Sequence, residues 1–205
     1  MRKKAVWGWR AGVLLLTALV AARCGDLARQ GQGASFLIIE DLRGSSGARP
    51  SEFGHVLESD VETIVSGVPT VFEDSGEVAV RTALKDPGSQ SSPNIPISNN
   101  LITVTRYRVV YRRSDGRNAP GVDVPYPFDG AVTFTAQGAG ASATFVLVRA
   151  QAKFEAPLRA LRGLGGAIVI STIADVTFYG HDQTGKAVSA TGSIGVNFAD
   201  WGDPS

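Results

Sequence analysis

Two long stretches near the end of the chain alternate apolar and polar residues with a period of two. A period of two places successive side chains on opposite faces of an extended strand, so one face of each strand is buried. The apolar positions are Ile168, Ile170, Ala174, Val176 and Phe178 in the first stretch and Val188, Ala190, Ile194, Val196 and Phe198 in the second. Between them, HDQTGK contains Asp182 and Gly185, which suit a short turn. The two stretches therefore predict a long antiparallel hairpin.

Earlier segments follow the same rule. Val78, Val80 and Leu84 share one face of a predicted strand, as do Val132 and Phe134 of another. Residues 142–154 are apolar on both faces at first and then alternate, which predicts that the following side chains point outward: Arg149, Gln151 and Lys153.

In residues 101–113 the apolar residues change from even-numbered to odd-numbered positions partway along the segment. It passes from Ile102 and Val104 to Tyr107, Val109 and Tyr111. An extra residue near Thr105 or Arg106 explains the change, so we predict a β-bulge there.

Residues 57–68 match helical spacing, but their β-branched residues and the turn that follows favour a strand. Residues 157–163 predict one short helical turn. Eight or nine strands without a long helix predict an all-β fold, a two-sheet antiparallel sandwich of the immunoglobulin-like type. A closed β-barrel is the alternative.

The first residues have the three parts of an export signal: a basic start, an apolar run from Ala11 to Ala22 and small residues before Cys24. This run is shorter than the roughly 20 residues that a transmembrane helix needs. We therefore interpret residues 1–23 as a cleaved signal peptide. Residues 24–34 are small and polar, as in a flexible tether, and residues 35–205 are expected to form a single domain.

Cys24 is the one cysteine of the chain, and the surrounding LVAARCGD resembles a bacterial lipobox, in which the cysteine receives lipid. Lipidation of Cys24 predicts a lipoprotein anchored in a membrane of the cell envelope. Arg23 departs from the small residue that normally precedes the lipidated cysteine. Cleavage after Ala22, giving a soluble periplasmic or secreted protein, and an uncleaved anchor remain alternatives.

The charge of the mature chain argues against nucleic acid as a partner. The chain has 20 Lys and Arg and 19 Asp and Glu, and five of the basic residues precede Cys24, which leaves 15 basic and 19 acidic residues. A net charge near −4 lacks the basic footprint of a nucleic-acid-binding protein. One cysteine also excludes an intramolecular disulfide.

Two loops, residues 85–100 and 114–130, are rich in turn-forming residues. Loops carry binding function more often than strands. The second loop offers a possible binding surface made of Arg117, Asp123, Tyr126, Phe128 and Asp129. The alternative is that its prolines stiffen a long connection and its aromatic residues cap a sheet edge.

Four arginines at positions 106, 108, 112 and 113 suggest either a basic stripe for acidic ligands or pairing with carboxylates across strands, and the pairing is favoured.

Motifs of catalysis are missing from the sequence. Residues 163–166, GLGG, lack the rest of a phosphate-binding loop, and no G-x-S-x-G elbow is present. Cys24, His55 and His181 do not supply a zinc ligand set. We expect no catalytic residue, metal or cofactor. The alternatives are a secreted hydrolase using either histidine, and a calcium- or carbohydrate-dependent adhesion module with Asp123 and Asp129, or Asp182, Asp200 and Asp203, as oxygen ligands.

Three segments, ITVTRYRVVYRRSDGRNAPGVDVPYPFDG, STIADVTFYGHD and GSIGVNFADWGDP, resemble a family of uncharacterised bacterial exported proteins, usually short lipoproteins. The resemblance covers most of the mature chain and implies a bacterial envelope setting without an activity. The sequence as a whole predicts a non-catalytic, lipid-anchored binding or structural module whose partner is a protein or a cell-surface polymer.

Overall fold

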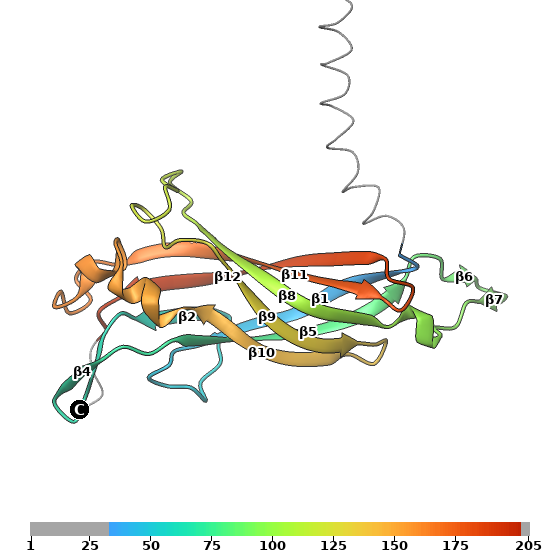
Figure 1. The fold of residues 1–205 in the computed structure, drawn as a ribbon, viewed down its shortest axis with the longest axis horizontal. Coiled ribbons are helices and arrows are strands. Elements are labelled where there is room, and N and C mark those ends of the chain that lie inside the picture. Colours follow the sequence, from blue (N-terminus) through green and yellow to red (C-terminus); the bar gives the residue numbers. More distant parts are fainter. Residues whose placement is uncertain (1–32, 202–205) are drawn as a thin grey trace, which may run out of the picture.

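The computed structural model describes residues 33–201, and these residues form an all-β fold, as predicted (Figure 1). Eight strands make two larger sheets. The three-stranded sheet has the order β1 (Ser35–Ser45), β5 (Asp74–Leu84) and β10 (Ala141–Val148). The five-stranded sheet has the order β2 (Val56–Asp60), β12 (Ala187–Ala199), β11 (Ile170–Asp182), β8 (Ile102–Arg112) and β9 (Phe128–Ala136). All pairs are antiparallel except β2 with β12, which is parallel.

The remaining elements are short. Two small hairpins are β3 (Thr63–Val65) with β4 (Val68–Thr70) and β6 (Gly88–Ser89) with β7 (Ser92–Pro93). Three short 3₁₀ helices are η1 (Ser98–Asn100), η2 (Ala150–Phe154) and η3 (Leu158–Leu161). Within residues 33–201, no helix has the length and apolar character to cross a membrane.

The hairpin predicted near the end of the chain is confirmed as β11 and β12. Its register runs from Ile170 opposite Phe198 to His181 opposite Ala187. The predicted inward positions of the strands are buried or partly buried in the core. Ile168 is the exception, because it precedes β11 and is 53% exposed. The alternation rule does not apply to it outside the strand.

The β-bulge predicted in β8 is also confirmed. Thr105 is skipped in the register with β9, between Val104 and Arg106, and in the register with β11. Both Thr105 and Arg106 are exposed, and the buried face resumes at Tyr107. One extra residue thus keeps both ends of β8 facing the core.

The two larger sheets share one buried core (Figure 1). They approach each other along two seams, with β1 beside β12 and β10 beside β9. Phe178 is fully buried, and the centre of its ring lies 5.3 Å from the ring centre of Phe145 and 6.1 Å from that of Tyr107. A glycine makes room for a ring at Gly76, where an added Cβ would overlap Phe145. Large aromatic side chains therefore fill the space between the sheets.

The segment after β10 corrects a sequence prediction. The strand ends at Val148, and residues from Ala150 onward turn into η2. Gln151 points outward as expected, but Lys153 is 1% exposed and its Nζ lies 2.9 Å from the Asp74 Oδ1 atom. A 3₁₀ helix has three residues per turn, so a period of two no longer indicates which side chains face solvent.

Asp74, the first residue of β5, is completely buried. Its Oδ2 accepts a hydrogen bond from the Ser59 hydroxyl at 2.6 Å, and its Oδ1 accepts one from the Gly47 amide at 2.9 Å. Burial raises the pKa of Asp74 above its ordinary value, against the opposing influence of Lys153 and these donors. The loop after β1, strand β2, strand β5 and helix η2 thus meet at one buried carboxyl group.

Residues 57–68 form strands, as favoured from the sequence, but these are three short ones, β2, β3 and β4, with a turn at Ser66–Gly67. Leu57 and Val61 are buried, whereas Ile64, Val65 and Val68 are exposed. The helical turn predicted in residues 157–163 is confirmed as η3.

Candidate binding surface

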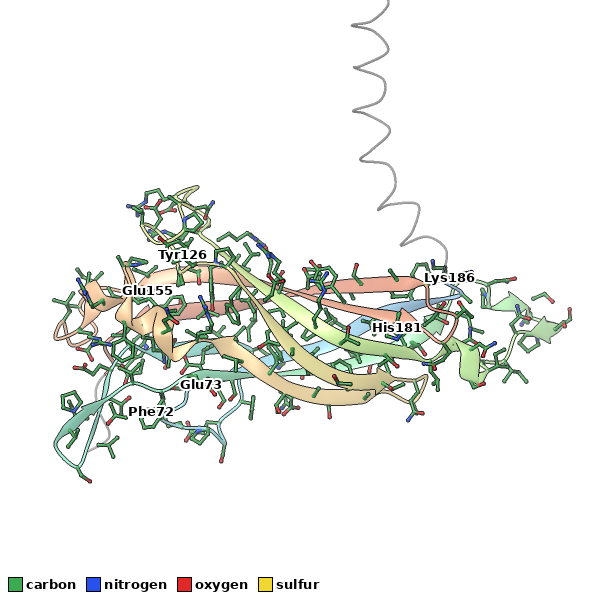
Figure 2. The ribbon with its side chains drawn as sticks, viewed as in Figure 1. Phe72, Glu73, Tyr126, Glu155, His181 and Lys186 are labelled. Carbon is green, nitrogen blue, oxygen red and sulfur yellow. The ribbon has the colours of Figure 1, made fainter. Side chains whose placement is uncertain are left out.

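The molecule is elongated, and its two ends differ in structure (Figure 1). One end holds Gly33, the first described residue, beside Val188 and Asp182 at the β11–β12 turn, together with the β6–β7 hairpin. The opposite end holds the β3–β4 hairpin, the β8–β9 loop and the segment after η3. We call this opposite end the distal end and define it as residues 62–70, 113–127 and 162–169. Figure 2 places Tyr126 there and His181 and Lys186 at the other end.

Exposed apolar side chains are concentrated at the distal end. It carries eight of the fourteen exposed large hydrophobic residues among residues 33–201: Ile64, Val65, Val68, Val122, Tyr126, Leu164, Ile168 and Val169. Val122 is 70% exposed and Val68 is 60% exposed. Single exposed apolar residues are ordinary, so the distinguishing feature of the distal end is that three separate segments there all carry them.

Polar contacts hold two parts of the distal end together at their bases. Asp60 accepts hydrogen bonds from the Thr63 hydroxyl at 2.7 Å and from the Trp201 amide at 3.0 Å. Burial raises the pKa of Asp60, although these donors act in the opposite direction. Glu62 pairs with Arg162 at 3.4 Å between Oε2 and NH1. The β3–β4 hairpin is therefore anchored to the segment after η3.

Internal contacts also order the β8–β9 loop. Asp115 accepts hydrogen bonds from the Arg113 and Arg117 guanidinium groups, and these bonds hold the pKa of Asp115 well below its ordinary value. Asp123 accepts a hydrogen bond from the Ala119 amide at 3.1 Å. The Tyr126 ring lies against Gly121, which leaves no room for a side chain there. The loop thus presents Val122 and Tyr126 on a structured support.

The structure brings together only part of the binding surface expected from the sequence. Arg117, Asp123 and Tyr126 lie in the β8–β9 loop, with Tyr126 50% exposed. Asp129 lies on β9, where it pairs with Arg106 and Arg108 of β8. Phe128 is buried, with its ring 6.2 Å from that of Tyr107, so it supports the loop from the core.

The exposed residues of β3–β4 and of the segment after η3 were not identified from the sequence. Ile64, Val65 and Val68 belong to a short hairpin whose turn is Ser66–Gly67, both with positive φ. The S-G pair was an available signal of a turn there. No local pattern indicates that Leu164 and Val169 lie at the same end of the molecule.

Arg106, Arg108 and Arg112 of β8 pair across strands, as favoured from the sequence, whereas Arg113 follows β8 and pairs with Asp115 two residues on. The Arg112 Nε atom lies 2.6 Å from the Asp175 Oδ2 atom, and Arg108 NH1 lies 2.7 Å from Asp129 Oδ2. Burial opposes ionisation of Asp175, but hydrogen bonds from Arg112 and Ser193 hold its pKa below the ordinary value. The guanidinium of Arg106 lies 3.8 Å from the centre of the Tyr179 ring. On this face, three arginines thus share two carboxylates, because Arg106 and Arg108 both pair with Asp129.

The two histidines lie in different places. His55 is 77% exposed, and its Nδ1 lies 3.3 Å from Asp41 Oδ1. His181 lines a shallow pocket of about 190 Å³ with Tyr179 and Ser189. Another cavity, of about 310 Å³, lies against β2 and includes Arg49, Glu52 and Phe53 in its lining. Neither histidine has a hydrogen bond to a serine in the part of the chain that the structure describes.

The acidic residues considered as calcium ligands accept hydrogen bonds from different backbone segments. Asp182 accepts hydrogen bonds from the amides of Thr184 and Lys186 in its own turn, and Asp200 accepts one from the Gly163 amide. In residues 33–201, no three His, Cys, Asp or Glu residues are close enough to hold a metal ion. Asp203 and Cys24 lie outside the described residues.

Comparison with known proteins identifies no relative. No family model, no curated protein and no solved structure matches this chain.

Proposed function

We propose that the chain is a non-catalytic module of a bacterial cell envelope, anchored by a lipid on Cys24, that binds a protein partner through its distal end. The observation that carries this proposal is the concentration of exposed apolar residues at the end opposite Gly33. With residues 24–34 as the tether, this surface faces away from the membrane. Apolar and aromatic residues such as Tyr126 are typical of the centres of protein interfaces.

For the fold, we propose a two-sheet antiparallel sandwich of the immunoglobulin-like type. The sheets bury a common apolar core, and in residues 33–201 no hydrogen-bonded ladder joins β1 to β12 or β9 to β10, which favours a sandwich over a closed barrel. The parallel pairing of β2 with β12 departs from an all-antiparallel arrangement. Such sandwiches use the loops at one end for recognition.

The role of Cys24 is tested by cell fractionation. Cys24→Ser is expected to move the protein from the membrane fraction to the soluble fraction, because a lipid chain requires the thiol for attachment. Arg23→Ala is the matched control: it keeps the cysteine, supplies the usual small residue and is expected to leave the protein in the membrane fraction. Immunoblots of both fractions give the distribution. Unchanged fractionation of Cys24→Ser would reject lipid anchoring.

The distal surface is tested by site-specific photo-crosslinking in intact cells. A photoreactive residue at Val68 or Val122 is expected to give an adduct of defined mass, whereas one at Ile95, at the opposite end, gives none. Ile95 is the matched control because it is apolar and 78% exposed. Protease treatment of the adduct separates a protein partner from a cell-surface polymer.

A second substitution tests whether the apolar contact matters. Val68→Asp is expected to lower the adduct yield at Val122 about tenfold, because it places an unpaired charge in an apolar contact, where its loss of hydration is unfavourable. Ile95→Asp should leave the yield unchanged. Equal crosslinking from the two ends, or no effect of Val68→Asp, would contradict binding through the distal end.

A further inference from the structure

The Lys153 amine and the Asp74 carboxyl group form an isolated buried pair. Their side chains are 1% and 0% exposed, and Nζ lies 2.9 Å from Oδ1. A charged ammonium has three N–H donors. Within residues 33–201, Asp74 is the single acceptor hydrogen-bonded to Nζ. Burial of an ion with incomplete hydrogen bonding is unfavourable, so the site destabilises the ion pair relative to uncharged groups.

The contacts of the carboxyl group match the needs of amide formation. The Gly47 amide donates to Oδ1 at 2.9 Å and can stabilise negative charge that develops on this oxygen. The Ser59 hydroxyl donates to Oδ2 at 2.6 Å and can pass a proton to it. Burial raises the pKa of Asp74, which agrees with a protonated acid at this position. The Lys153 amine, the Asp74 carboxyl carbon and the two hydrogen-bond donors, the Gly47 amide and the Ser59 hydroxyl, are therefore held together in one buried site.

We infer that Lys153 and Asp74 condense to an intramolecular isopeptide bond between Nζ and Cγ. A proton first passes from the ammonium to the carboxylate, which leaves a neutral amine and a carboxylic acid. Nζ then attacks Cγ, and the charge on Oδ1 is stabilised by the Gly47 amide. Ser59 gives its hydroxyl proton to Oδ2, which leaves as water, and Ser59 regains a proton from Nζ, which thereby loses its second proton. One C–N bond forms, one C–O bond breaks, and one water molecule is released without an oxidant or cofactor.

The position of the pair favours this reaction. Two groups held in contact react with effective concentrations that reach roughly 10⁵–10⁸ M in well-oriented systems. In water the free acid and amine are stabilised as hydrated ions, and the buried site removes that hydration. The product amide is neutral, and its carbonyl oxygen keeps the hydrogen bond from Gly47.

The bond would link the start of β5 to η2 across a separation of 79 residues. The chain has one cysteine, so it cannot form an internal disulfide. An isopeptide bond between β5 and η2 would supply an internal covalent link that a disulfide cannot. This inference does not depend on which partner the distal end binds.

Mass spectrometry of the denatured full chain tests the inference. A tryptic digest is expected to contain residues 44–81 joined to residues 150–159, with Lys153 uncleaved and a mass lower by one water molecule than the sum of the two peptides. Cleavage of the N-terminal segment does not affect this measurement, because both peptides lie within the domain. Free peptides 44–81, 150–153 and 154–159, without the joined species, would overturn the inference.

Two variants test which residue supplies the amine and whether Ser59 relays the proton. Lys153→Met keeps an apolar stem without the amine. It is expected to abolish the joined peptide and the mass difference of one water molecule. Ser59→Ala is expected to slow formation at least tenfold in newly synthesised protein, followed after a pulse of isotope label, with circular dichroism showing an unchanged β fold. A joined species that persists in Lys153→Met would assign the water loss elsewhere and refute the bond. Formation at the wild-type rate in Ser59→Ala would refute the relay.

Discussion

Asp74→Ala is expected to lower the free energy of unfolding by about 3–5 kcal/mol, the usual cost of leaving one member of a buried pair without its partner. The substitution leaves the Lys153 amine, the Ser59 hydroxyl and the Gly47 amide without their acceptor in a site closed to water. It also removes any amide formed between the two side chains. For a domain of this size the melting temperature should fall by roughly 6–20 °C, as measured by calorimetry or circular dichroism.

The matched control is Glu40→Ala, which breaks the ion pair with Arg81. That pair is shorter, 2.6 Å between Arg81 Nε and Glu40 Oε1, but both side chains are more than 40% exposed. Exposed pairs contribute about 0–1 kcal/mol, so little change in melting temperature is expected. If Asp74→Ala were as mild as Glu40→Ala, the buried pair would have no special role in stability.

Phe178→Ala is the second substitution with a large expected effect. Phe178 is fully buried on β11, and its ring meets Phe145 and Phe134 edge to face at centroid distances of 5.3 and 6.4 Å. Removing a buried aromatic ring costs about 3–5 kcal/mol, since apolar burial and packing contacts are lost and a cavity is left. Urea denaturation should show a lower midpoint with an unchanged slope.

Phe36→Ala provides the comparison for the loss of a ring at a half-exposed position. Phe36 lies in β1 and is 51% exposed, so its removal is expected to cost about 1 kcal/mol or less. Comparable losses from the two substitutions would contradict the placement of Phe178 at the centre of the core.

The candidate surface was only partly predictable from the sequence. The turn-forming residues identified the β8–β9 loop, and Arg117, Asp123 and Tyr126 do lie in it. Phe128 follows within two residues of Tyr126 in the chain, yet it enters β9 and faces the core. Ile64 and Leu164 are a hundred residues apart in the chain, and only the folded structure places both at the distal end.

The sequence by itself determined the local β structure: the β11–β12 hairpin, the bulge at Thr105 and the inward faces of the long strands. These features follow from side-chain periodicity and turn residues, which act over a few neighbouring positions. Only the tertiary structure decided the strand order, the distal end and the burial of Lys153. These depend on contacts between distant segments, and the partner of Lys153 lies 79 residues away. No local periodicity specifies such a contact, because its energy comes from burial and packing that exist only after the sheets meet.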